Sequence, residues 1–232
     1  QRVVFQNYED MNLFIEKALI DKDKTVIIKG SGVDIKYFSP EYCQEEVKDT
    51  FIFLMVSRLL WDKGVKEFVE AGRLLKKRYG DSIELWLLGP LDKGNPSSVS
   101  EEDLKRWIKE GLVKYLGVAE DVRPYMCKAN CVVLPSYREG VPRSLLEAMA
   151  MAKPIITTDS PGCREVCKDG ENGFLVRARD VESLFKAMER MYNLSREERE
   201  EMGRRGRQLA LEEFSEGRVV KAYLSIIFGE EG

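Results

Sequence analysis

Two glutamates, Glu139 and Glu147, bracket the predicted start of a helix. Pro142 lies near that start, where a missing N–H group removes no helical hydrogen bond. The free N–H groups of the first turn can hold an anion, and carboxylates on either side can accept hydrogen bonds from hydroxyl groups. This combination fits a ligand with phosphates in the middle and hydroxyls at both ends, such as a nucleotide sugar. The spacing alone equally allows a capping glutamate and a surface glutamate.

Two basic residues follow an earlier apolar run. Arg58 comes directly after the run 51–57, and Lys63 stands at the start of a helical pattern over 63–79. A forked guanidinium and a compact ammonium at one strand end together suit a diphosphate. The alternative is that both are solvated surface charges.

Glycines follow two further runs. Gly89 comes after 83–88, while Gly117 and Val118 come after 113–116. Glycine lets a ligand approach the backbone closely, although an ordinary turn explains a glycine at these places equally well.

The elements that must position these residues alternate along the chain. Short, nearly continuous apolar runs are typical of strands buried on both faces, and amphipathic helical patterns separate them. The sequence predicts strands over 51–57, 83–88, 113–116, 131–135, 154–157 and 174–176, and helices over 63–79, 100–110, 142–151 and 181–192. This alternation favours an α/β fold with a Rossmann-like, doubly wound parallel sheet, whose ligands bind beyond the carboxyl ends of the strands.

Additional segments flank this α/β domain at both ends of the chain. Residues 1–30 predict a strand, a helix over 8–19 and a strand over 25–28, followed by the turn-like segment 29–34. The tail from residue 195 predicts two helices, the second near 216–228. Because the chain opens at Gln1 directly in a strand pattern, we interpret this as a start inside a longer gene product.

The composition excludes several kinds of chemistry. The chain has no histidine, which removes Ser-His, Cys-His and His-metal sites. Its net charge of -3 lacks the basic excess that is typical of nucleic-acid binders. The five cysteines favour reduced thiols, and the pairs Cys127/Cys131 and Cys163/Cys167 favour buried thiols over a metal site. No apolar run reaches the ~20 residues of a membrane helix, and no signal peptide is visible.

Several of these segments occur together and in the order of one family. The chain resembles the family-4 retaining glycosyltransferases of the GT-B fold, and the resemblance covers nearly everything from about Gly30 onward. The segments that carry it are Ser57-Arg58-Leu59 with Lys63-Gly64, Leu88-Gly89, Tyr115-Leu116-Gly117, Val133-Leu134-Pro135-Ser136, Glu139 with Glu147-Ala148-Met149-Ala150, and Gly170-Glu171-Asn172-Gly173-Phe174-Leu175-Val176.

The resemblance implies a role for each matching residue. Arg58 and Lys63 would neutralise the donor diphosphate, and Glu139 would contact the transferred sugar, so these three are the predicted catalytic residues. Glu147 would hold the ribose hydroxyls. The other predicted donor-binding residues are Ser57, Gly89, Gly117, Val118, Gly140, Val141, Pro142, Arg143 and Ser144.

One departure from the family pattern indicates which subgroup of the family the chain resembles. Many members have Phe-Gly-Leu after the first Glu-Gly, whereas this chain has Val141-Pro142-Arg143. Together with the segment 161–165, this resembles the bacterial subgroup that builds capsule, O-antigen or protein-glycan precursors on polyprenyl diphosphate. Arg143 would then contact a donor or acceptor phosphate, or else be a surface charge.

The resemblance also implies an organisation and a mechanism. Residues 1–30 would end the acceptor half, 31–214 would bind a nucleotide sugar, most often a UDP-sugar, and 215–232 would cross back to the first half. It implies transfer with retention, no cofactor, no required metal and a glycan or lipid-linked acceptor. It places the enzyme in the cytoplasm, with peripheral contact at the inner face of the membrane. The alternatives are a nucleotide-sugar epimerase and a noncatalytic nucleotide-binding α/β module.

Overall fold

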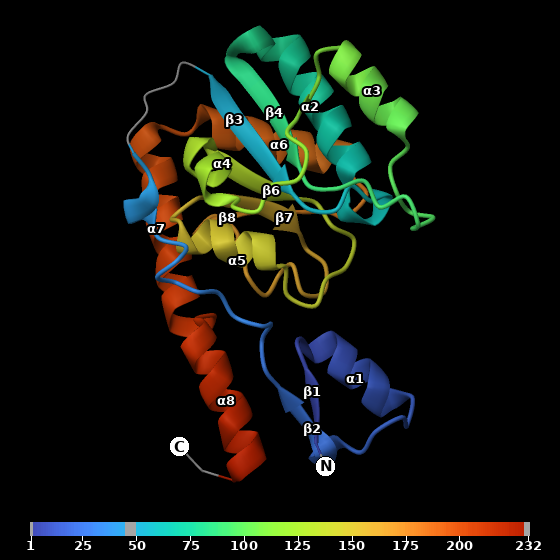
Figure 1. Ribbon diagram of the computed structural model, residues 1–232, viewed down its shortest axis with the longest axis vertical. Helices are drawn as coiled ribbons and strands as arrows, with labels where there is room; N and C mark the ends of the chain where they lie inside the picture. The colour runs from blue at the N-terminus through green and yellow to red at the C-terminus, as the bar shows by residue number, and fades with distance from the viewer. Residues whose placement is uncertain (1, 45–49, 230–232) are drawn as a thin grey trace.

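A computed structural model describes residues 2–44 and 50–229 of the chain. These residues form one large α/β body and a small β-α-β unit that projects from it (Figure 1). Within this described part, none of the helices is both long enough and apolar enough to cross a bilayer.

A parallel sheet of six strands forms the centre of the body. Its strand order is β5-β4-β3-β6-β7-β8, and the central strand β3 pairs in register with both β4 and β6. The strands are β3 (Phe51–Val56), β4 (Ile83–Leu88), β5 (Lys114–Tyr115), β6 (Cys131–Leu134), β7 (Ile155–Thr158) and β8 (Gly173–Val176). All six predicted strands and the predicted fold class are therefore confirmed.

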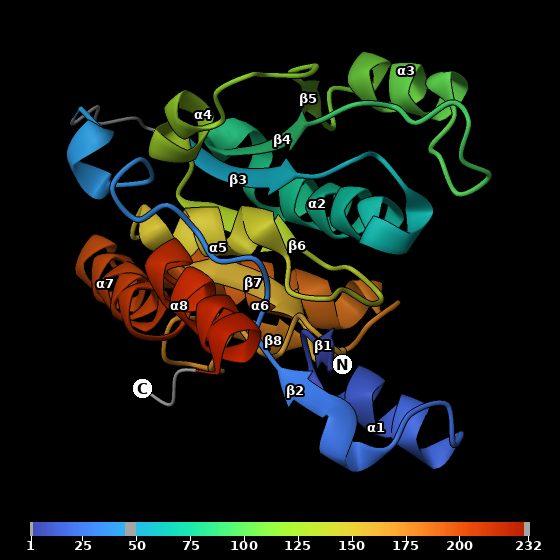
Figure 2. The ribbon, with the colours of Figure 1, turned by 60° about the horizontal axis from the view of Figure 1, so that its bottom comes forward.

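Helices cover both faces of this sheet. The helices α2 and α6 lie on one face, with α3 beside α2, while α4, α5 and α7 lie on the other (Figure 2). Their bounds are α2 (Val65–Tyr79), α3 (Glu101–Lys109), α4 (Arg123–Lys128), α5 (Arg143–Ala150), α6 (Val181–Asn193) and α7 (Arg196–Glu213). The sequence patterns predict all of these except the short α4. Helix α3 begins as predicted, because Ser100 Oγ accepts a hydrogen bond from the Asp103 amide.

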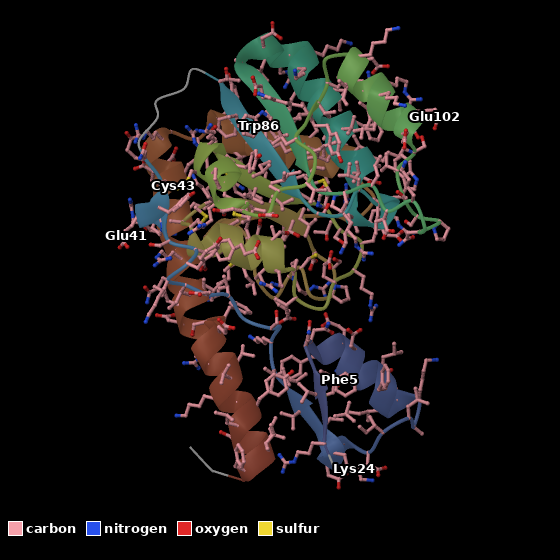
Figure 3. All side chains as sticks on the ribbon, viewed as in Figure 1. Phe5, Lys24, Glu41, Cys43, Trp86 and Glu102 are labelled. Carbon is pink, nitrogen blue, oxygen red and sulfur yellow. A yellow bond between two sulfur atoms is a disulfide. The ribbon has the colours of Figure 1, made fainter. Side chains whose placement is uncertain are left out.

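The small unit consists of β1 (Val3–Phe5), α1 (Tyr8–Glu16) and β2 (Thr25–Ile27), with the two strands parallel. The ring of Phe5, labelled in Figure 3, lies within this unit. It packs edge-on against Phe14 of α1, which gives the unit its own apolar contact. Helix α8 (Glu216–Phe228) extends from the body on the same side as this unit (Figure 1).

Backbone hydrogen bonds join the segment between the small unit and the body to the start of α8. The Val33 amide donates to the carbonyl oxygen of Phe214 at 2.8 Å, and the Glu216 amide donates to that of Val33 at 3.0 Å. Gly30 and Gly32 precede this point with φ of +69° and +78°, a region that glycine adopts readily. The predicted domain boundaries at 30/31 and 214/215 stay predictions. The first lies at the glycine turn, and the second lies at the backbone contact with Val33.

The prediction that all cysteines are reduced thiols is wrong for one pair. Cys43 and Cys127 form a disulfide, with Cα atoms 5.2 Å apart and a separation of 84 positions in sequence. Cys43 lies on the flank of the body beside Glu41 (Figure 3). The sequence spacing groups Cys127 with Cys131, whereas the fold brings Cys127 next to Cys43, which is distant in sequence. Cys131, Cys163 and Cys167 are buried free thiols.

Candidate functional site

The strand order places a ligand-binding position between β3 and β6. From β3 the chain proceeds outward to β4 and β5, whereas from β6 it proceeds outward in the other direction to β7 and β8. In sheets of this kind, the crevice beyond the carboxyl ends of the two central strands is where ligands bind. The segments 57–64 and 135–142 follow these two strands and therefore build the candidate site.

Lys63 and Glu139 meet at this position. The Lys63 ammonium forms an ion pair with the Glu139 carboxylate, and their side chains are only 22% and 13% exposed. Lys63 ends a single 3-10 turn, and the Glu139 amide is anchored on the carbonyl of Pro161 at 3.1 Å. Both are predicted catalytic residues, and the structure brings them into direct contact.

The helix that follows Glu139 has an uncapped amino end. Helix α5 begins at Arg143, one residue later than predicted, and Pro142 directly before it provides no side-chain cap. Among the residues that the structure describes, no side chain caps the first turn of α5, which suits an anionic ligand.

Glu147 lies one turn inside α5. Burial raises the pKa of its carboxyl group, and the Arg143 guanidinium, 3.7 Å away, partly opposes this effect. Because the Arg143 guanidinium offsets only part of the desolvation of this carboxylate, keeping it ionised lowers the stability of the folded state.

Arg58 is not part of the Lys63–Glu139 pair. Its guanidinium donates to the Asp92 carboxylate at 2.8 Å, and its side chain is 55% exposed. Ser57 Oγ donates to the carbonyl of Arg58 at 3.0 Å. Arg58 and Lys63 thus lie after the same strand but bond to different partners, so their predicted joint action on a diphosphate stays a prediction.

Gly89 has a packing role that the sequence did not predict. Its φ is +140°, and a Cβ atom there would lie 1.9 Å from the carbonyl oxygen of Ser57. Its amide donates to the Gly117 carbonyl at 2.8 Å, while Tyr115 Oη donates to the Gly89 carbonyl at 3.1 Å. These contacts join the ends of β3, β4 and β5, and they leave Val118 70% exposed beyond them.

The small unit contacts the loop that carries Glu139. A Cβ atom on Gly140 would lie 2.1 Å from Gln6 Oε1, and the buried Asn7 side chain donates to the Gly140 carbonyl at 3.5 Å. Val141 is buried, and Gly30 lies against it. Ser144 occupies the second position of α5.

Two ion pairs reinforce this contact. Asp10 pairs with Arg138, and Glu9 pairs with Arg164 at 2.6 Å. Neither pair is predicted from the sequence. The sequence does show acidic residues in the first turn of α1 and an arginine in each of two loops that follow strands, but it does not show that they meet.

The family of the chain follows from comparison with known proteins. The sequence profile described as glycosyl transferases group 1 matches residues 43–209, more than half of the chain. The chain belongs to this family. The relationship predicted from the strand-end motifs is therefore confirmed at the level of the family.

Two curated relatives illustrate the similarity of this group 1 chain to glycosyltransferases. It is 35% identical over 181 residues to the N,N'-diacetylbacillosaminyl-diphospho-undecaprenol alpha-1,3-N-acetylgalactosaminyltransferase of Campylobacter jejuni, covering 74% of this chain and 46% of that protein. It is 26% identical over 200 residues to the UDP-Gal:alpha-D-GlcNAc-diphosphoundecaprenol alpha-1,3-galactosyltransferase of Escherichia coli, covering 82% and 51%. The chain thus spans about half the length of these relatives.

Solved structures share the fold of this group 1 glycosyl transferase chain. Alr3699/HepE of Anabaena in complex with UDP has a TM-score of 0.85 at 20% identity, covering 99% of this chain and 64% of that one. WaaG, a glycosyltransferase involved in lipopolysaccharide biosynthesis, has a TM-score of 0.80 at 17% identity, covering 99% and 63%. At these identities the likeness shows the fold.

Replacing Glu147 of this group 1 chain by glutamine is expected to raise its stability at neutral pH. The raised pKa means that the ionised Glu147 is disfavoured in the folded state relative to the unfolded state. The advantage of the glutamine variant is fully present above the folded-state pKa. It shrinks as the pH falls through that value toward the unfolded-state value, because the wild-type carboxyl then becomes protonated. Urea unfolding at a series of pH values measures this difference, and a variant less stable than the wild type at neutral pH contradicts the assignment.

Proposed function

We propose that this chain binds the nucleoside diphosphate part of a nucleotide-sugar donor beyond the carboxyl ends of β3 and β6, within an enzyme that transfers the sugar. The observation that carries the proposal is the Lys63–Glu139 ion pair beside the uncapped start of α5. On this proposal, the pair and the helix start supply a cation and amide donors for phosphate and a carboxylate for sugar hydroxyls, at the switch point of the sheet.

Each side chain has a proposed role. Lys63 turns its ammonium from Glu139 to the diphosphate when the donor binds, which frees the Glu139 carboxylate for the hydroxyls of the transferred sugar. Arg58 leaves Asp92 to bind the same diphosphate. Glu147 accepts hydrogen bonds from the ribose hydroxyls, and the largely buried position of its carboxylate makes those bonds stronger than in water.

The proposed reaction proceeds with retention, by displacement on one face of the sugar. The bond between the anomeric carbon and the diphosphate oxygen breaks, and the acceptor oxygen forms the new bond on the same face. The acceptor proton passes to the leaving diphosphate. The protein's main contribution is electrostatic, because Lys63, Arg58 and the start of α5 act on the charge that develops on the diphosphate. No step requires a metal ion or a cofactor.

The acceptor is proposed to be a glycan or a polyprenyl-diphosphate-linked sugar in bacterial or archaeal polysaccharide synthesis. The names of the relatives, which include diphospho-undecaprenol, support this class. We further propose that residues 1–30 complete an acceptor-binding half, that 31–214 hold the donor and that 215–232 return to the first half. The whole enzyme would then work at the inner face of the membrane.

Calorimetry of the chain with UDP tests the donor site. We expect UDP and UDP-sugars to bind, and UMP to bind at least about 10-fold more weakly, because it lacks the second phosphate that Lys63 is proposed to hold. Lys63→Ala should reduce the difference between UDP and UMP.

The control variant is Lys186→Ala, since Lys186 forms an exposed ion pair with Glu182 within α6, outside the segments 57–64 and 135–142 that build the candidate site. This variant should bind UDP as the wild type does. Failure of UDP, GDP and UDP-sugars to bind at millimolar concentration contradicts the proposal and favours a noncatalytic module. Product analysis of the whole enzyme distinguishes sugar transfer from epimerisation of the donor.

A further inference from the structure

Glu67 is a buried carboxylate with no place in the proposed donor contacts. It lies in the first turn of α2 and is 6% exposed. Its Oε1 accepts a hydrogen bond of 2.8 Å from the Tyr137 hydroxyl, whereas its Oε2 is the only buried side-chain oxygen or nitrogen without a partner in the described part of the chain. Leaving a buried carboxylate oxygen unpaired destabilises a fold, so the residue needs another explanation.

Tyr137 connects this carboxylate to the candidate site. It lies two residues before Glu139, and its amide donates to the carbonyl of Asp62 at 2.9 Å. Ser136 Oγ donates to the same carbonyl at 3.2 Å. Asp62 directly precedes Lys63, so the two segments that carry the Lys63–Glu139 pair are bonded to each other at the base of that pair.

The Tyr137 side chain adds a third connection between these segments. Its hydroxyl reaches Glu67, four residues after Lys63, and the Arg179 guanidinium lies 4.6 Å from the centre of its ring. Burial and the bond to Glu67 raise the pKa of Tyr137, so its hydroxyl stays a hydrogen-bond donor at working pH. The ring also lines a pocket of about 440 Å³ together with Trp61 and Lys66, so its outer side is not tightly packed.

We propose that Glu67 and Tyr137 are positioning residues, which set the separation and direction of the Lys63 ammonium and the Glu139 carboxylate for the transfer reaction. This inference rests on the proposed function. A carboxylate gives a stronger hydrogen bond than a neutral acceptor, and a bond that fixes a loop residue can align a reacting group to within a fraction of an ångström. The unpaired Oε2 lowers stability while the paired Oε1 holds the loop that carries Glu139.

The test uses Tyr137→Phe in the whole enzyme, with Tyr79→Phe as the matched control. Tyr79 lies at the other end of α2, and its hydroxyl also bonds to a glutamate, Glu189, at 3.0 Å. We expect Tyr137→Phe to lower kcat about 10-fold, because misalignment acts on the reaction more than on ground-state binding. Its donor KM should match that of Tyr79→Phe. Its Tm should fall further than that of Tyr79→Phe, because the buried Glu67 carboxylate is left without a partner while Glu189 keeps Arg78.

Substitutions of Glu67 separate positioning from a general structural role. Glu67→Ala should lower kcat as much as Tyr137→Phe, and the double variant should be no worse than either single variant, because both remove one bond. Glu67→Gln keeps an acceptor oxygen for the hydroxyl and should recover most of the lost kcat without lowering Tm.

Two results would overturn the positioning role. One is a kcat for Tyr137→Phe equal to that of Tyr79→Phe in an active enzyme, and the other is a loss that appears only as a lower Tm or a higher KM. A wild-type enzyme that neither binds UDP nor transfers sugar instead refutes the proposed function, and the positioning role with it. The wild-type measurement thus distinguishes the two failures.

Discussion

Lys63→Ala is expected to lower the kcat of the whole enzyme about 100-fold or more, because on the proposed mechanism it removes the positive charge that acts on the charge developing on the leaving diphosphate. The ammonium is held by Glu139 in a largely enclosed position, with only 22% of its side chain exposed. A charge at such a place is screened less by water than a surface charge, so its loss weighs more heavily. Steady-state kinetics with saturating donor and acceptor measure the effect.

The comparison variants are Lys186→Ala and Arg58→Ala. Lys186 also pairs with a glutamate, Glu182, but its side chain is 67% exposed, so its removal should leave kcat within about 2-fold of the wild type. Arg58→Ala tests whether the guanidinium leaves Asp92 for the diphosphate, and on that assignment it also lowers kcat about 100-fold. Near-wild-type turnover of both Lys63→Ala and Arg58→Ala would refute the assignment.

Gly64→Ala is expected to lower the free energy of unfolding of the chain by roughly 4 kcal/mol. Gly64 has φ of +77°, and a Cβ atom there would lie 2.2 Å from the carbonyl oxygen of Pro135. The left-handed backbone contributes about 1 kcal/mol of this effect, and the overlap with backbone atoms that cannot rotate away contributes the rest. Urea unfolding followed by circular dichroism measures the change.

Gly111→Ala provides the matched control for that measurement. Gly111 also has a positive φ, +68°, but a Cβ atom there meets nothing within 4 Å. Its substitution should therefore cost about 1 kcal/mol, from the backbone conformation alone. If Gly64→Ala costs no more than Gly111→Ala, the close approach of the two strand-end segments does not hold in solution.

Much of the sheet could be predicted because its strands are buried on both faces. A strand such as β4 is apolar at nearly every position and is followed by a glycine, so both its type and its end are visible in the sequence. Helix α4 was missed because six residues with Pro124 at the start carry too little periodicity. The Cys43–Cys127 bond was missed because residues 84 apart in sequence give no local signal.

The candidate site was predictable in its parts but not in its connections. Lys63 and Glu139 could be selected because each follows a strand end in a recognisable pattern. That they pair with each other depends on β3 lying beside β6, which the order of strands along the chain does not state. The bond from Tyr137 to Glu67 joins a loop to a helix that precedes it by 70 residues, and only the folded chain brings them together.

The backbone bonds of Val33 with Phe214 and Glu216 have a mechanical consequence. The segment that leads from the β1-α1-β2 unit into the body and the segment that leads from the body into α8 are hydrogen-bonded to each other at Val33. Gly30 and Gly32, which have positive φ, lie just before this contact. A rotation of the β1-α1-β2 unit at these glycines would leave the contact of Val33 with the start of α8 intact, but it would have to break the Asp10–Arg138 and Glu9–Arg164 ion pairs.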